Sequence, residues 1–93
     1  MKKQHLKAAD RAAVVIVDEL LRRDWDPIGV LDEPQARNEY TDYARHIVAL
    51  LRLGKSPSDV AKFLVNVERD AMGLAPDERR AERVANLLFA ALP

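Results

Sequence analysis

The sequence predicts an all-α fold, a compact four-helix domain in which residues 1–93 form a single unit. Apolar residues recur at the spacing of an α-helix with one buried face. Proline, glycine and serine interrupt this pattern at intervals, and these residues are typical of helix ends. A hydrophobic content of 48% with 32% charged residues is that of a folded chain, and 93 residues suffice for one core.

The first helix is predicted from about Leu6 to Arg23. Its apolar residues recur on one face: Leu6, Ala9, Ala13, Ile16, Val17 and Leu20. The charged residues gather on a narrow stripe that includes Arg11 and Asp18, so that most other directions are apolar. Such a helix needs neighbours on more than one side. We interpret it as the central helix of the bundle or as one that also meets a second copy, which would make a homodimer.

The stretch Trp25-Asp26-Pro27-Ile28-Gly29-Val30 predicts a structural turn. Pro27 disfavours helical backbone at Asp26, so the first helix must end here, and Gly29 permits the chain to turn. Trp25 is large and apolar, and we expect it to be buried. Asp26 has two interpretations, a carboxylate with a raised pKa for acid–base chemistry or an acceptor of backbone N–H bonds, and we favour the second.

The second helix is predicted to begin at Asp32-Glu33-Pro34, where acidic groups and a proline suit the first turn. It runs to about Leu53 and ends at Gly54, in the usual position of a helix-terminating glycine. The residues expected to face the core are Tyr40, Tyr43, Ala44, Ile47 and Leu51.

The third helix is predicted to start at Ser56-Pro57-Ser58-Asp59, with Ser56 as the cap, and to end at Gly73. Pro76 is predicted to open the fourth helix. The residues expected to face inward are Val60, Phe63, Leu64, Val67 and Ala71 in the third helix and Ala81, Val84, Leu87, Leu88, Ala91 and Leu92 in the fourth. In the fourth helix, Arg79, Glu82, Arg83 and Asn86 are expected on a solvated face.

A polar patch on the outer face of the second helix is the predicted partner-binding surface. Its members are Asn38, Glu39, Asp42, Arg45 and His46. The acidic members would suit a basic protein partner. Glu39, Asp42 and His46 lie on adjacent turns and could bind zinc or manganese, but a plain charged face explains them better, so we predict no metal and no cofactor.

Two other features of the third helix allow more than one interpretation. Glu68 projects near Leu64, Ala61 and Met72, so it is either a buried carboxylate paired with an arginine or a residue at the helix edge, and we favour the helix edge. The connection from Ala49 to Val60 has the spacing of a helix-turn-helix motif. The outward residues would then be Lys62, Asn66 and Arg69, together with Asp59 and Asp70, which DNA phosphates would repel.

Composition excludes several classes of function. The 15 basic and 15 acidic residues cancel, which argues against nucleic acid as a partner. The chain has no cysteine, and no nucleophile and base can be assembled, so we predict that it is not an enzyme. The longest apolar run, residues 12–17, is too short to span a bilayer, and no signal peptide is expected, so we predict a cytoplasmic protein without a membrane partner.

The turn and the helix after it resemble a set of small bacterial helical domains of unknown function. The resemblance rests on Trp25-Asp26-Pro27-Ile28-Gly29, on Asn38-Glu39-Tyr40, and on a Leu50-Leu51 helix that ends near Gly54. It covers roughly residues 15–72, and Asn38 stands where the pattern has an acidic residue. Similar domains occur among candidate immunity proteins, which neutralise a toxin secreted by neighbouring bacterial cells. The resemblance therefore implies a non-enzymatic protein-interaction domain; the alternative is a small helix-turn-helix regulator that binds DNA.

Overall fold

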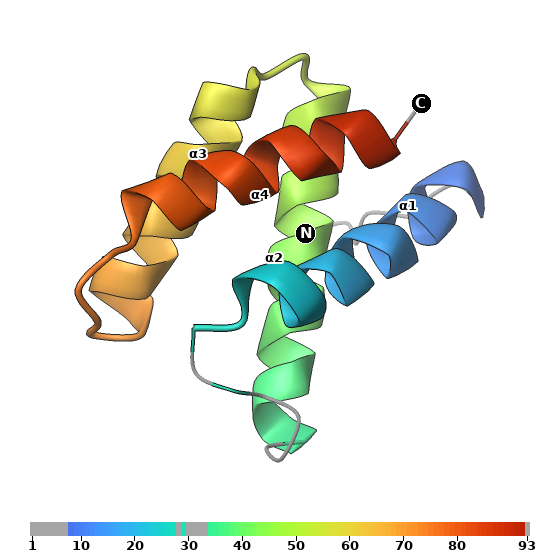
Figure 1. The fold of residues 1–93 in the computed structure, drawn as a ribbon. Coiled ribbons are helices and arrows are strands. Elements are labelled where there is room, and N and C mark those ends of the chain that lie inside the picture. Colours follow the sequence, from blue (N-terminus) through green and yellow to red (C-terminus); the bar gives the residue numbers. More distant parts are fainter. Residues whose placement is uncertain (1–7, 28, 30–33, 93) are drawn as a thin grey trace, which may run out of the picture.

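The computed structural model describes residues 8–27, 29 and 34–92, and this part of the chain is all-α (Figure 1). Its helices are α1 (Ala8–Leu20), α2 (Pro34–Arg52), α3 (Pro57–Asn66) and α4 (Glu78–Ala91). Two of them continue into a π-helical turn, α1 into η1 (Leu21–Trp25) and α3 into η3 (Val67–Ala71). The predicted all-α four-helix fold is confirmed.

The helices pack mainly as two pairs. α1 lies against α2, and α3 lies against α4, while α4 also contacts α1 and η1. In Figure 1, α2 (green) runs behind α1 and α4, and α4 (red) crosses in front of it. None of the described helices is long and apolar enough to cross a membrane.

The helix boundaries follow the local signals closely. Pro34 is the first residue of α2, and Gly54 follows its end with a φ of 78°, a conformation that favours glycine. At the start of α3 the Ser56 hydroxyl accepts a hydrogen bond from the Asp59 N–H at 3.2 Å, and the Asp59 carboxylate accepts one from the Ser56 N–H at 3.0 Å. This reciprocal capping box confirms the predicted start of α3.

The start of the fourth helix differs from the prediction. α4 begins at Glu78 rather than at Pro76. Asp77 caps it, because its carboxylate accepts a hydrogen bond from the Arg80 N–H at 3.0 Å. A carboxylate satisfies an N–H of the first turn, which proline cannot do, so the cap decides the boundary.

The first helix also extends beyond its predicted end at Arg23, through η1 to Trp25. The Asp26 N–H donates to the Leu21 carbonyl at 2.8 Å, which closes a turn one residue wider than an α-helical turn. Because of this wider turn, the chain leaves the helix only after Trp25, whose side chain is buried. The predicted core residue Leu6 lies outside the described residues.

The core contains residues from every helix. Its fully buried larger side chains are Val17, Leu21, Trp25, Tyr40, Ile47, Val48, Val60, Leu64, Val84 and Leu88. Some residues predicted to face inward are exposed instead: Ala9, Ile16, Ala71, Leu87 and Ala91. Ala9, Ile16 and Leu87 lie at the border of the apolar arc of their helix, whereas Ala71 and Ala91 are the last residues of η3 and α4.

Candidate functional site

The predicted partner-binding residues lie together on the outer face of α2. Asn38, Glu39, Asp42, Arg45 and His46 are all exposed. Arg45 Nη1 is 2.8 Å from Asp42 Oδ1, so these two charges offset each other. The Tyr43 hydroxyl donates to Glu39 Oε2 at 3.4 Å. The patch is therefore polar and weakly acidic, and of its two carboxylates Glu39 is the one that forms no ion pair with another described residue.

An aromatic contact that the sequence did not predict extends this patch. His46 stacks on Phe63 of α3, with ring centroids 4.3 Å apart and planes within 6° of parallel. Phe63 also meets Tyr43 edge-on at 6.3 Å. Phe63 was predicted to face the core, yet it is only half-buried and supports an exposed ring. We call the combined region the α2 surface: Asn38, Glu39, Asp42, Tyr43, Arg45, His46 and Phe63.

The Tyr43 hydroxyl shows the electrostatic effect of this surface. Partial burial raises the pKa of Tyr43, and the negative charge of Glu39, which accepts the tyrosine proton in a hydrogen bond, raises it further. The hydroxyl therefore stays protonated at neutral pH and donates to Glu39. This long contact links Glu39 to the border of the aromatic contact.

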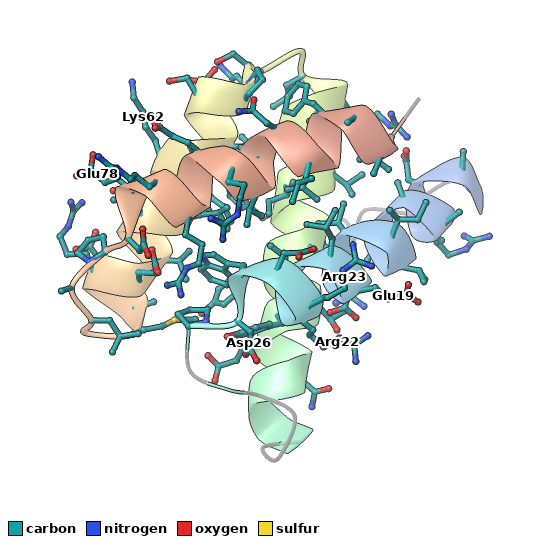
Figure 2. The ribbon with its side chains drawn as sticks, in the orientation of Figure 1. Glu19, Arg22, Arg23, Asp26, Lys62 and Glu78 are labelled. Carbon is teal, nitrogen blue, oxygen red and sulfur yellow. The ribbon has the colours of Figure 1, made fainter. Side chains whose placement is uncertain are left out.

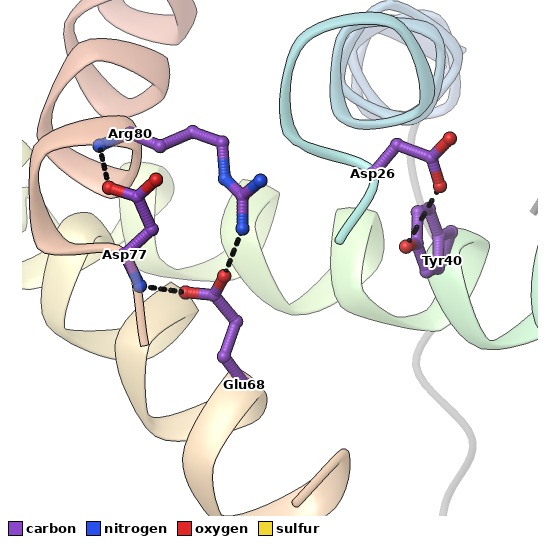
Figure 3. Close-up of polar contacts among 5 residues, drawn as sticks. All are labelled: Asp26, Tyr40, Glu68, Asp77 and Arg80. Atoms are coloured by element: carbon purple, nitrogen blue, oxygen red, sulfur yellow. Dashed lines mark hydrogen bonds and ion pairs between the residues drawn. The ribbon is translucent and has the colours of Figure 1, made fainter. Parts of the chain in front are cut away.

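The Trp25 turn lies beneath the α2 surface as a structural element. Trp25 is 1% exposed, and its ring lies 5.3 Å from Tyr40 and 6.1 Å from Tyr43. The Tyr40 hydroxyl donates to Asp26 Oδ1 at 3.1 Å (Figure 3). Asp26 has a φ of 22° and Gly29 a φ of 67°, so the chain turns sharply on both sides of Pro27. The predicted burial of Trp25 is confirmed.

The Asp26 carboxylate therefore contacts a different helix, α2. Its bond to Tyr40 ties the end of η1 to the inner face of α2, a partner that the sequence did not reveal. Trp25 Nε1 is buried and has no hydrogen-bond partner among the described residues. An unsatisfied buried N–H costs about 1–3 kcal/mol, so the packing of the indole ring must outweigh that cost.

Glu68 is a buried carboxylate paired with an arginine, so the interpretation favoured from the sequence, a residue at the helix edge, is wrong. It is 0% exposed in η3 and accepts hydrogen bonds from Arg80 Nη2 at 2.5 Å and from the Asp77 N–H at 3.3 Å. Figure 3 shows this carboxylate between the side chain of Arg80 and the backbone of Asp77. The network joins η3 to the first turn of α4. Both carboxylate oxygens are engaged within the fold, so we assign Glu68 a structural role.

Three of the five outward residues of the helix-turn-helix interpretation line a groove, and Asp59 and Asp70 do not. Lys62, Asn66 and Arg69 form one side of an open groove of about 640 Å³ between α3 and α4. The other side carries Glu78 and Glu82; Figure 2 labels Lys62 and Glu78 on the two walls. An α3 helix inserted into DNA would bring these two carboxylates towards the phosphates, which would repel them.

The three residues considered as a metal site, Glu39, Asp42 and His46, each contact a different partner. Asp42 pairs with Arg45, and His46 stacks on Phe63. Within the described residues, no group of three or more histidine, aspartate or glutamate side chains could hold a metal ion. No protein-family model, curated protein or solved structure matches the chain.

Proposed function

We propose that this chain is a non-enzymatic protein-interaction domain that binds a protein partner through the α2 surface. The observation that carries the proposal is the exposed stack of His46 on Phe63, bordered by Glu39 and the Asp42–Arg45 pair. Binding surfaces are enriched in aromatic residues and arginine at their centre and are polar at their edge. The α2 surface has aromatic residues at its centre and Glu39 and the Asp42–Arg45 pair at its edge, and two helices, α2 and α3, hold it in place.

The partner is expected to be basic at its point of contact. Glu39 is exposed and carries a negative charge that no other residue of the α2 surface offsets, because Arg45 is paired with Asp42. Complementary charge speeds association and orients the two proteins. A nuclease toxin, whose active site must attract phosphate, has this chemistry. An immunity-type inhibitor in the cytoplasm therefore agrees with both the surface and the family resemblance.

A DNA-binding regulator is the second candidate function. It is supported by Lys62 of α3 and Arg69 of η3, which are exposed and line the same groove. Glu78 and Glu82 on the opposite wall of the groove and the zero net charge both weigh against it. We therefore rank DNA binding below protein binding.

One experiment separates the two functions. The purified chain is loaded on heparin and on duplex DNA at low salt, and it is titrated calorimetrically with the product of the adjacent gene, because immunity genes lie beside their toxin genes. We expect no retention on either column and a saturable complex with the neighbouring protein. Retention on duplex DNA, lost as salt increases, would support the regulator and reject the interaction domain.

A further inference from the structure

The outer side of α1 exposes apolar residues among charged ones, and no other described segment covers them. Val15 is 56% exposed and Ile16 is 40% exposed, and the neighbouring Ala9 and Ala12 are also exposed. β-branched and alanine side chains on the solvent side contribute nothing to the core of this chain. A contiguous apolar patch of this kind marks a contact with another molecule.

A groove runs beside this helix face. Its volume is about 390 Å³, and α1, α2 and α4 all contribute to its walls. The lining residues are apolar except Arg52: Ala9, Ala12, Ala13, Ile16, Val48, Leu51, Arg52, Phe89 and Leu92. Arg52 is bound to Asp10 at 2.5 Å, so its charge is already paired. The alanines on α1 allow the backbone of another helix to approach closely.

We infer that this face binds the same face of a second copy of the chain, with the two α1 helices antiparallel and crossing at Val15. Arg11 and Glu19 lie four residues before and after Val15, and both are exposed. Each step of four residues advances about 40° around a helix, so all three residues lie on one side. Figure 2 labels Glu19 on the outer side of α1.

The charged residues on this face can pair with those of a second copy only when the two α1 helices are antiparallel. A twofold axis through Val15 places Arg11 of each copy opposite Glu19 of the other, which gives two ion pairs. A parallel pair would place like charges together. Arg11 also has an interaction within its own chain, and a guanidinium has five donors, enough for both. The zero net charge of the chain means that two copies do not repel each other overall.

The size of the patch predicts a weak dimer. The 13 residues of α1 extend over about 20 Å, so the contact is the face of one short helix. A standard interface buries about 800 Å² per partner and takes about 20 or more residues from each, which is more than one such face supplies. We therefore expect dissociation in the micromolar range rather than a permanent dimer.

The test is sedimentation equilibrium of the whole chain from about 1 μM to about 1 mM. The average mass is expected to rise from 10.5 kDa towards twice that value. Val15→Asp places two carboxylates against each other across the axis and should weaken the dimer at least tenfold. Leu53→Asp is the matched control, since Leu53 is 72% exposed and lies outside the face and the groove. The dimer of this variant should dissociate with the wild-type dissociation constant.

A charge exchange tests the orientation. Arg11→Glu or Glu19→Arg alone should weaken the dimer, and the two together should restore it, with far-UV circular dichroism confirming that each variant is folded. A mass of 10.5 kDa at every concentration, a dimer unaffected by Val15→Asp, or a double variant as weak as the single ones would overturn the inference. The measurement needs no other protein, so its failure leaves the proposed partner surface on α2 untouched.

Discussion

Neighbouring residues of α2 have opposite surroundings. Tyr40 is fully buried against Trp25 and binds Asp26, whereas Glu39 is exposed and accepts a hydrogen bond from Tyr43, one turn further along α2. The inner face of α2 thus contributes to the fold, and the outer face leaves its charges accessible. The comparison teaches that residue type alone does not assign a role, since Glu68 is as buried as Tyr40 while Glu39 is accessible to a partner.

The largest loss of stability is expected from a substitution in the core, at Trp25. Trp25→Ala removes the ring that packs on Tyr40 and Tyr43 and should destabilise the fold by about 3–5 kcal/mol. Urea melts give the free energy of unfolding. The native fluorescence of Trp25 should be blue-shifted and move to the red on unfolding. A native spectrum like that of tryptophan in water would place Trp25 at the surface and remove the distinction between the two faces.

Removing either partner of the buried Glu68–Arg80 ion pair should destabilise the fold, but by different amounts. Arg80→Ala leaves the Glu68 carboxylate, 0% exposed, without its counter-charge and should cost about 3–5 kcal/mol. Glu68→Ala leaves Arg80, whose side chain is 26% exposed and can reach water, so the cost should be lower, about 2–3 kcal/mol. Glu82→Ala, exposed on α4, is the control and should change stability by less than about 0.5 kcal/mol. Equal losses for Glu68→Ala and Glu82→Ala would mean that the pair contributes nothing.

A smaller effect is expected at the start of α3. Ser56→Ala should cost about 1 kcal/mol because the Asp59 N–H loses its acceptor, and Ser56→Asp should be tolerated. Hydrogen bonds from Ser56 lower the pKa of Asp59. A lowered pKa means that this contribution is present above about pH 4 and is lost as the pH falls through the folded-state pKa. Urea melts at neutral and acidic pH measure both effects; identical curves for wild type and Ser56→Ala would exclude the cap.

The sequence was sufficient to predict features that depend on residues close together in the chain. Ser56, Pro34 and Gly54 marked helix ends because capping and backbone conformation involve residues close in the chain. It was insufficient wherever the partner comes from a distant segment. The stack of His46 on Phe63 and the choice of Arg80 as the partner of Glu68 depend on how helices cross, which no local pattern encodes.

Periodicity also could not show where the buried face of each helix ends. Ile16 and Leu87 have the spacing of core residues, but they lie just beyond the contact with a neighbouring helix. The exposed position of Ile16 is what makes the outer side of α1 a candidate contact. A wrong assignment to the core is therefore informative, since it shows where apolar surface remains uncovered.

The central claim is that the outer face of α2 serves binding and not folding, and the variant carrying both Glu39→Lys and Asp42→Lys tests it most directly. Exposed charges contribute little to stability, so the thermal midpoint should stay within a few degrees of the wild-type value. Affinity for the basic partner, measured by calorimetric titration, should fall at least tenfold, or about 1.4 kcal/mol. A fold that is intact and an affinity that is unchanged would contradict the claim and place the binding surface elsewhere.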